Sequence, residues 1–224
     1  MSKNSTPETV AFFDLDRTLI SINSGFDYAM YELKQGRISW LQFLRATGWM
    51  SLYHLSLIDM PRVFGEAVRH YRGIHVDELR EITADFFEKH VTPTIQPGAR
   101  RTLEEHREKG HQLVLLTASS PYMSELAVDA LDLDDWIANR FPTDERGLLR
   151  GCFERPMCYG PGKVHRARYW ARRRGVDLEG AYFYTDSYTD LPMLKRVDHP
   201  RVVNPDPRLR REALRRGWPI EDWS

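Results

Sequence analysis

Four aspartates stand just after two short apolar runs of the chain: Asp14, Asp16, Asp186 and Asp190. Residues two apart on an extended chain point the same way, so the first two can converge on one point, while the last two have the i, i+4 spacing of one helix face. Carboxylates gathered in one place repel one another unless a cation lies among them. Acidic and carbonyl oxygens suit Mg²⁺, which completes its shell with substrate phosphate. The pattern therefore indicates a magnesium site that handles a phosphate group.

A hydroxyl and an amine are available to bind the remaining oxygens of such a phosphate. Thr117 follows an apolar run and leads into Ala118–Ser120, so hydroxyls and free amides open a helix, which is a natural seat for an anion. Lys163 opens another helix after the turn Gly160–Gly162. A lysine and a hydroxyl at one edge of a sheet fit phosphate oxygens that a metal leaves free.

The apolar runs that precede these residues have the unpatterned character of strands covered on both faces. Three are strong and a fourth is weaker: Val10–Phe13, Gln112–Leu116, Ala181–Tyr184 and Arg201–Val203. Helical patterns stand between the later ones: Gly98–Lys109, Pro121–Leu131, Gly162–Arg174 and Asp190–Val197. This alternation predicts an α/β fold with a doubly wound, mostly parallel sheet. Ligands bind beyond the carboxyl ends of such strands, which is where the polar residues stand.

The stretch from Ser24 to Val91 does not follow this alternation. It holds roughly four helical segments in a row, with breaks near Gly36, Asp59 and Gly73–His75. We therefore expect an α/β core of residues 1–22 and 92–224 and an inserted helical cap of residues 23–91. Residues 139–154 carry an Arg-Gly turn and predict a short hairpin.

In order, these motifs resemble the four motifs of the haloacid dehalogenase superfamily, and the insertion resembles the cap of its phosphoserine-phosphatase-like branch, subfamily IB. The motif residues are Asp14-x-Asp16-x-Thr18, Thr117, Lys163 and Asp186-x3-Asp190. The resemblance covers nearly the whole chain. It also extends to Asp-Ser-x-x-Asp-Leu-Pro-Met-Leu and to the tail that begins with Asn204-Pro-Asp-Pro.

The resemblance implies a role for each motif residue. Asp14 would attack phosphorus and form an aspartyl-phosphate, and Asp16 would protonate the leaving oxygen and then activate water. Mg²⁺ would be held by the carboxylates of Asp14 and Asp186 and the main-chain carbonyl of Asp16, with Asp190 as a further ligand or as support. The phosphoryl group would be bound by the following residues: Thr18, Thr117, Ala118 and Lys163.

The chain departs from the family pattern at two places. Thr185, Ser187 and Thr189 stand where the branch often has Gly, Gly and Asn, which affects the surroundings of the metal rather than the reaction. Phosphoserine phosphatases carry a glutamate nine residues after the nucleophile that helps to hold the substrate ammonium, and here that position is Asn23. Phosphoserine is therefore not favoured, and histidinol phosphate or another small phosphomonoester stays open.

Composition limits the partners. The 224 residues have a formal net charge of zero, with 42% hydrophobic and 29% charged residues, which gives no field for nucleic acid or an anionic membrane. The apolar segment Trp40–Ile58 is interrupted by polar residues; it could face lipid or an apolar substrate tail, and we favour packing within the cap. With no signal peptide, the chain is expected in the cytoplasm.

The sequence thus predicts a magnesium-dependent phosphatase acting on a small phosphate ester. Two alternatives stay open: a phosphotransferase or mutase that passes the aspartyl-phosphate to another hydroxyl, and a non-catalytic regulatory or lipid-associated module. The presence of both Asp16 and Lys163 argues against the latter.

Overall fold

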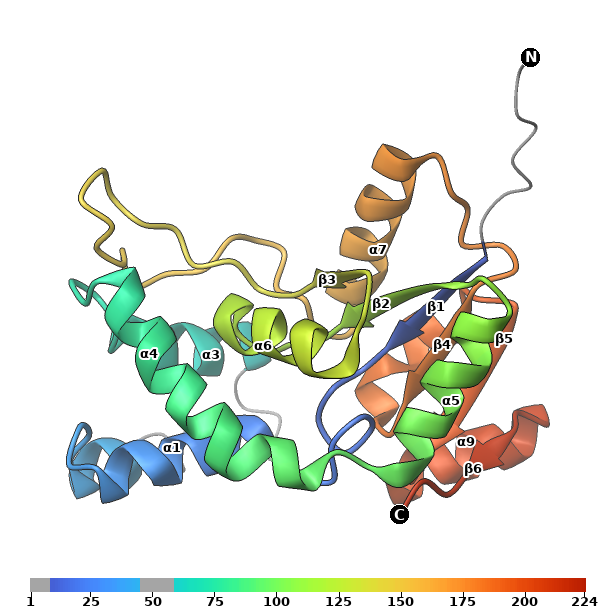
Figure 1. The fold of residues 1–224 in the computed structure, drawn as a ribbon, viewed down its shortest axis with the longest axis horizontal. Helices are drawn as coiled ribbons and strands as arrows, with labels where there is room; N and C mark the ends of the chain where they lie inside the picture. Colours follow the sequence, from blue (N-terminus) through green and yellow to red (C-terminus); the bar gives the residue numbers. More distant parts are fainter. Residues whose placement is uncertain (1–8, 45–58) are drawn as a thin grey trace.

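A computed structural model describes residues 9–44 and 59–224 of the chain, and in this part the predicted sheet is present (Figure 1). All six strands of the sheet run parallel, in the order β3-β2-β1-β4-β5-β6. Their bounds are β1 Val10–Phe13, β2 Gln112–Leu116, β3 Asp135–Ile137, β4 Tyr182–Thr185, β5 His199–Val203 and β6 Ile220–Glu221. The α/β prediction is confirmed, and the strands β3 and β6 are additions that the sequence patterns had not indicated.

Helices cover both faces of the sheet. They are α5 Pro97–Glu108, α6 Pro121–Leu131, α7 Pro161–Arg174, the short α8 Leu191–Leu194 and α9 Pro207–Arg216. Alternate residues of β1 enter two separate cores: Ala11 and Phe13 pack with residues of α5 and α6, whereas Val10 and Phe12 pack with residues of α7, α8 and α9. Both faces of β1 are buried, so no position of the strand favours a polar residue. This is why the run Val10–Phe13 is uniformly apolar.

The ends of these helices follow local chemistry. Ser120 caps α6 by accepting a hydrogen bond from the Met123 N–H, with Pro121 in the first turn, and Asp206 caps α9 in the same way. Gly175 ends α7 in the left-handed conformation, which glycine adopts without a steric penalty. The Ser120 cap fixes the start of α6 directly after the loop that follows β2.

The insertion after β1 is helical. It contains α1 Ser24–Lys34, helical residues 40–44, α3 Met60–Arg69 and α4 Val76–Phe86, and α4 passes through a π-helical turn, Phe87–Val91, and a 3₁₀ turn, Thr92–Thr94, into the core. Residues 45–58 of the Trp40–Ile58 segment lie outside the described residues. At the beginning of that segment, Trp40 is exposed and stacks on the buried Phe43.

An arm of residues 139–154 joins the core to the cap. The predicted hairpin forms: Thr143 bridges Leu149, the Asp144 N–H donates to Leu148 O at 2.9 Å and the Arg150 N–H donates to Pro142 O at 3.0 Å. Residues 147–149 also pair with residues 73–76, just before and at the start of α4. The Gly73 N–H donates to Leu149 O at 2.8 Å and the Val76 N–H donates to Gly147 O at 2.9 Å. Gly147 has a φ of 77°, in the left-handed region that favours glycine, and a Cβ there would also lie 2.6 Å from His75 Nε2. The predicted core range 92–224 thus includes a segment that contacts the cap.

A second contact holds the cap on the core. The Arg80 guanidinium of α4 lies over the Tyr122 ring of α6, 5.7 Å from its centre, and 3.5 Å from the Glu125 carboxylate.

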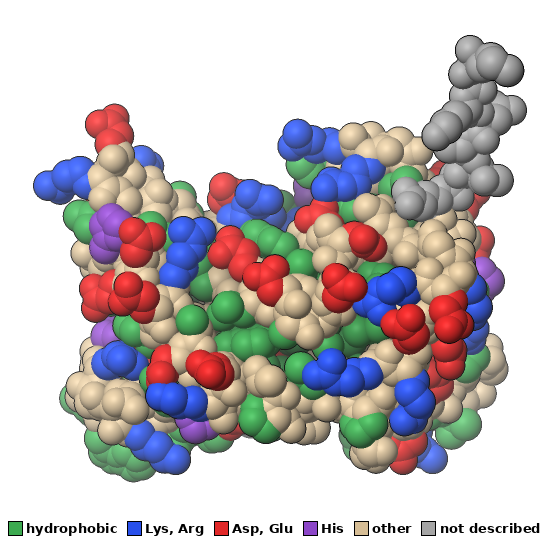
Figure 2. Space-filling model, in the orientation of Figure 1, with side chains coloured by type: hydrophobic (Ala, Val, Ile, Leu, Met, Phe, Trp, Pro, Cys, Tyr) green, Lys and Arg blue, Asp and Glu red, His purple; other side chains and the backbone are tan. Residues whose placement is uncertain are grey.

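On the face shown in Figure 2, basic and acidic side chains are interspersed around apolar ones, so this face carries no field of one sign.

Candidate active site

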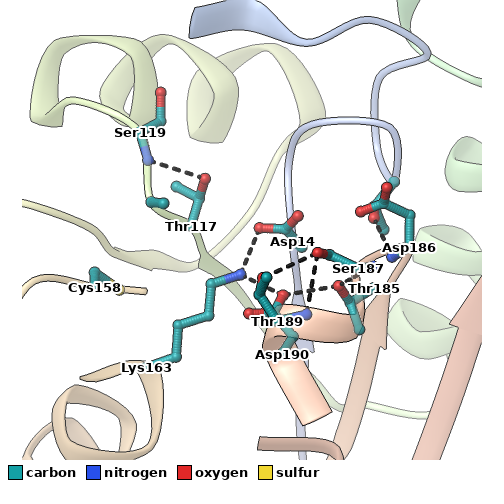
Figure 3. Close-up of polar contacts among 12 residues, drawn as sticks. Asp14, Thr117, Ser119, Cys158, Lys163, Thr185, Asp186, Ser187, Thr189 and Asp190 are labelled. Atoms are coloured by element: carbon teal, nitrogen blue, oxygen red, sulfur yellow. Dashed lines mark hydrogen bonds and ion pairs between the residues drawn. The ribbon is translucent and has the colours of Figure 1, made fainter. Parts of the chain in front are cut away.

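A buried lysine lies between two carboxylates at the carboxyl edge of the sheet (Figure 3). The Lys163 ammonium, from the first turn of α7, donates to Asp14 Oδ1 and to Asp190 Oδ2, each at 2.7 Å. The exposed fractions of Asp14, Lys163 and Asp190 are 7%, 2% and 2%. Three residues that are far apart in the sequence therefore share one water-poor site, as their positions at strand and helix ends predict.

Burial and charge act in opposite directions on these groups. Burial raises the pKa of Asp14 to about 7, with Lys163 lowering it and the negative charges of Asp190 and Asp16 raising it further. Burial alone would lower the pKa of Lys163, but Asp14 and Asp190 outweigh it and hold the ammonium charged. One lysine does not balance the carboxylates around it, so the site favours a further positive charge.

Asp186 shows the same imbalance. Burial raises its pKa to about 8, and the neighbouring Asp14 and Asp190 raise it as well. The Asp186 main-chain N–H donates to Thr18 Oγ1 at 3.1 Å, and Thr18 is fully buried. The Thr18 oxygen thus helps to position Asp186, and its phosphate-binding role, which the family resemblance implies, stays a prediction.

Asp16 lies where the core meets the cap. Its Oδ1 accepts a hydrogen bond from the Ser24 N–H at 2.9 Å, at the start of α1, and its side chain is half-buried. Burial raises the pKa of Asp16, and the bond from Ser24 lowers it in part. A carboxyl group that keeps some solvent contact and a raised pKa is suited to exchanging a proton.

Hydroxyl groups surround Asp190. The Thr185 hydroxyl donates to Asp190 Oδ2 at 2.8 Å and accepts from the Ser187 N–H at 3.2 Å, and the Ser187 hydroxyl lies 2.9 Å from Thr189 Oγ1. The three residues that depart from the family pattern thus form one network. Asp190 Oδ2 is shared by Thr185 and Lys163, so Asp190 orients the lysine.

Within residues 9–44 and 59–224, no three His, Cys, Asp or Glu side chains form a metal-binding group. The set that the resemblance implies does not need three, because it combines the carboxylates of Asp14 and Asp186 with the main-chain carbonyl of Asp16. The two raised pKa values point to the same place. A hard divalent cation there would meet oxygen ligands, as Mg²⁺ prefers.

Thr117 forms part of a short loop after β2. Its Oγ1 accepts a hydrogen bond from the Ser119 N–H at 3.2 Å, which leaves its own hydroxyl proton to be donated. In the view of Figure 3, Thr117 and Lys163 lie on one side of Asp14 and Asp186 on the other.

The sequence patterns missed Gln96 as a support of the loop after β1. The Gln96 Nε2 donates to the carbonyl of Thr18 at 2.6 Å and to that of Arg17 at 3.3 Å, and its Oε1 accepts from Asn204 Nδ2 at 2.8 Å. Arg17 has a φ of 55°, a conformation that costs energy for a residue with a Cβ. Asn204 was visible in the tail motif, whereas nothing in the sequence distinguishes Gln96.

Asn23 is placed by the structure as a helix cap. Its Oδ1 accepts from the Phe26 N–H at 3.0 Å at the start of α1, and its side chain is exposed. An exposed asparagine at this position is accounted for by capping alone. Its proposed part in selecting a substrate stays a prediction.

Comparisons with known proteins agree with this geometry. The model of the family described as haloacid dehalogenase-like hydrolase matches residues 11–195. A Streptomyces azureus protein named for inhibition of morphological differentiation is 35% identical over 228 residues, covering 100% of this chain and 81% of that protein. A probable phosphatase of Mycobacterium tuberculosis is 34% identical (96% and 76% covered), and a histidinol-phosphatase of Neisseria meningitidis is 26% identical (95% and 98% covered).

Solved structures share the fold. A Bordetella pertussis protein of unknown function superposes with a TM-score of 0.90 at 26% identity, covering 98% of this chain and 100% of the other. A phosphoserine phosphatase, solved as an analogue of its phospho-aspartyl intermediate, superposes with a TM-score of 0.66 at 17% identity, covering 94% and 99%.

We predict that Gln96→Leu destabilises the protein. The change removes the donor to two main-chain carbonyls and the acceptor of Asn204, so the free energy of unfolding should fall by about 1–3 kcal/mol. Urea denaturation measures it. Gln112→Leu is the matched control, because Gln112 is half-buried and its side chain makes no hydrogen bond among the described residues. Equal losses for both variants would mean that Gln96 does not support the loop.

Proposed function

Because the chain belongs to the haloacid dehalogenase-like hydrolase family, we propose that it is a phosphatase that hydrolyses a small phosphate monoester through an aspartyl-phosphate on Asp14. The observation that carries the proposal is the buried Lys163 ammonium 2.7 Å from both Asp14 and Asp190. Homologues named phosphatases support the same class of reaction. Fold alone would not, since one fold supports many reactions.

Asp14 is the nucleophile in this proposal. One of its carboxylate oxygens bonds to phosphorus while the bond from phosphorus to the ester oxygen breaks, and water later attacks the same phosphorus and releases Asp14. The attacking carboxylate must be ionised. Lys163 favours ionisation, and its ammonium remains to neutralise the phosphoryl oxygens that approach.

Asp16 moves the proton. It donates a proton to the departing ester oxygen in the first step and takes one from the attacking water in the second. The hydrogen bond from Ser24 fixes the direction of its carboxyl group from the cap side. The leaving group therefore has to lie between Asp16 and the cap.

The phosphoryl group is held by Lys163, by the Thr117 hydroxyl and by the main-chain N–H of Ala118. The carboxylates of Asp14 and Asp186 and the main-chain carbonyl of Asp16 would hold Mg²⁺. When bound, Mg²⁺ supplies positive charge that offsets the carboxylates and orients a phosphate oxygen. The raised pKa values of Asp14 and Asp186 support a cation at this place.

Selectivity has to come from outside these motifs, since they touch only the phosphoryl group. Asp14 is 7% exposed, so the site has to open for a substrate to reach it, and we propose that the cap moves to allow this. The substrate is a small phosphorylated metabolite: one relative is named histidinol-phosphatase, and relatives in the same fold are phosphoserine phosphatases.

Among the described residues, no helix is both long and apolar enough to cross a bilayer. Cytoplasmic location and the absence of a nucleic-acid partner stay predictions.

Removal of divalent metal should stop the reaction. With an aryl phosphate and Mg²⁺ the wild-type protein should release phosphate, and excess EDTA should abolish this release until Mg²⁺ is restored. Without the metal, the carboxylates of Asp14 and Asp186 repel the negatively charged phosphate ester. The rate of phosphate release measures it. Undiminished turnover in EDTA would contradict the metal assignment.

The two carboxylates after β1 should differ in their effect. Asp14→Asn should abolish turnover and leave no acid-stable phosphoprotein after incubation with labelled phosphate ester. Asp16→Asn should lower kcat by about 100-fold or more for an alkyl phosphate, and by much less for an aryl phosphate whose leaving group needs no proton. Near-normal turnover by a folded Asp14→Asn protein would require another nucleophile.

The selectivity assigned to Asn23 is tested best by aspartate. Asn23→Glu would add the charge that phosphoserine phosphatases carry, but it would remove the cap of α1, whereas Asn23→Asp keeps the cap and adds a carboxylate. We expect Asn23→Asp to raise kcat/KM for phosphoserine over that for an uncharged ester by up to about tenfold, which one charge-assisted hydrogen bond of about 1.5 kcal/mol would give. An unchanged ratio in a folded, active variant would show that Asn23 does not face the substrate.

A further inference from the structure

Asn139 is a buried carboxamide that links two loops of the active site. It lies two residues after β3, and its exposed fraction is 0%. Its Nδ2 donates to Ala118 O at 2.6 Å, and its Oδ1 accepts from the Cys158 N–H at 2.8 Å. Because a carbonyl only accepts and an N–H only donates, these partners fix which way the amide is turned.

The first link controls the loop after β2. A peptide unit is planar, so the bond to the Ala118 carbonyl also fixes the direction of the Ser119 N–H. That N–H donates to Thr117 Oγ1, at 3.2 Å. With its oxygen occupied as an acceptor, the Thr117 hydroxyl has its proton left for the phosphoryl group. The Asn139 main-chain N–H adds a bond to Ser119 O, at 3.4 Å.

The second link controls the start of α7. Cys158 opens a tight turn in which the Gly162 N–H donates to Tyr159 O at 2.9 Å and the Lys163 N–H donates to Gly160 O at 3.1 Å. A Cβ on Gly162 would lie 1.8 Å from the Met157 carbonyl oxygen, so the turn is packed too closely to admit a side chain at this position. Fixing the main chain at Cys158 therefore fixes where α7 begins and where the Lys163 ammonium reaches.

We propose that Asn139 is a positioning residue of the phosphoryl site, which keeps the Thr117 hydroxyl and the Lys163 ammonium at the correct separation for one phosphate group. The proposal rests on the phosphatase function proposed above. It predicts that Asn139 controls affinity for the phosphoryl group itself, whatever the leaving group. A residue that only stabilises the fold would not do so.

The test is Asn139→Asp, which has nearly the same shape. Asp keeps an oxygen for the Cys158 N–H but replaces the donor to Ala118 O with a second acceptor, so that two oxygens face each other. In the Mg²⁺-loaded protein we expect the inhibition constant of inorganic phosphate to rise, and kcat/KM for an aryl phosphate to fall, each by about 10- to 100-fold, the range that a misplaced binding group produces. Steady-state kinetics with two different phosphate esters measures the inhibition constant of inorganic phosphate, and the change in this constant should be the same with either ester.

Trp170→Phe is the matched control. It removes the partly buried hydrogen bond from Trp170 Nε1 to Asp135 Oδ2, at 2.6 Å, and so also weakens the contact between α7 and β3, away from the phosphoryl site. For the folded Trp170→Phe protein, the inhibition constant of inorganic phosphate should stay within twofold of the wild-type value. An Asn139→Asp protein that is folded and behaves like this control would overturn the proposal.

A double variant locates the effect. If Asn139 acts through the Thr117 hydroxyl, adding Asn139→Asp to Thr117→Val should weaken phosphate binding much less than Asn139→Asp does alone. If the fold-changes in phosphate affinity caused by Asn139→Asp and Thr117→Val simply multiply in the double variant, Asn139 does not act through the Thr117 hydroxyl.

The proposal stays testable when Asn139→Asp does not fold. In the wild-type protein with Mg²⁺, added inorganic phosphate should shift the NMR signals of the Asn139 side-chain amide and leave the Trp170 indole signal in place. An unshifted Asn139 amide at saturating phosphate would overturn the proposal. Failure of the proposed function looks different: phosphate binds and shifts these signals, but the wild type hydrolyses no ester.

Discussion

The Lys163 ammonium held between Asp14 and Asp190 is the interaction on which the rest of the site depends. Removing one partner of a buried pair leaves an uncompensated charge at a cost of about 3–5 kcal/mol, so this contact holds together the three elements that carry these residues. In the proposed reaction the same contact favours the ionised form of Asp14. One ammonium does not neutralise the surrounding carboxylates, which is why the pKa values of Asp14 and Asp186 are raised and why we propose a cation at this place. Stability and chemistry thus have one electrostatic origin.

Neutral amides hold the loops around this charged centre. Gln96 joins the carbonyls of Arg17 and Thr18 to Asn204, and Asn139 joins a carbonyl of one loop to an N–H of another. A carboxamide offers a donor and an acceptor without adding charge, and both Gln96 and Asn139 are buried, so each bond also avoids the penalty of an unpaired polar atom. Lysine or aspartate in these places would alter the pKa of the reacting groups.

Much of this was predictable from the sequence, and the remainder has identifiable reasons. Asp14, Thr117 and Asp186 follow uniformly apolar strands, a pattern strong enough to predict both the sheet and its active edge. The strands β3 and β6 escaped because they have only three and two residues and mixed polarity. Asn139 and Gln96 escaped because their role depends on partners far along the chain, which no local spacing reveals. The hairpin predicted within residues 139–154 forms around the turn Asp144–Gly147, whereas its additional pairing with residues 73–76 escaped because those residues lie far away along the chain.

The arm of residues 139–154 has a mechanical consequence. It leaves the core at Asn139 and returns close to Cys158, whose main-chain N–H donates a hydrogen bond to the Asn139 side-chain oxygen. Its far end is tied to the cap at Gly73 and Val76. The arm therefore connects the cap to the two loops that Asn139 joins. Any displacement of residues 73–76 that keeps these hydrogen bonds would be passed along the arm to the main chain beside Thr117 and Lys163.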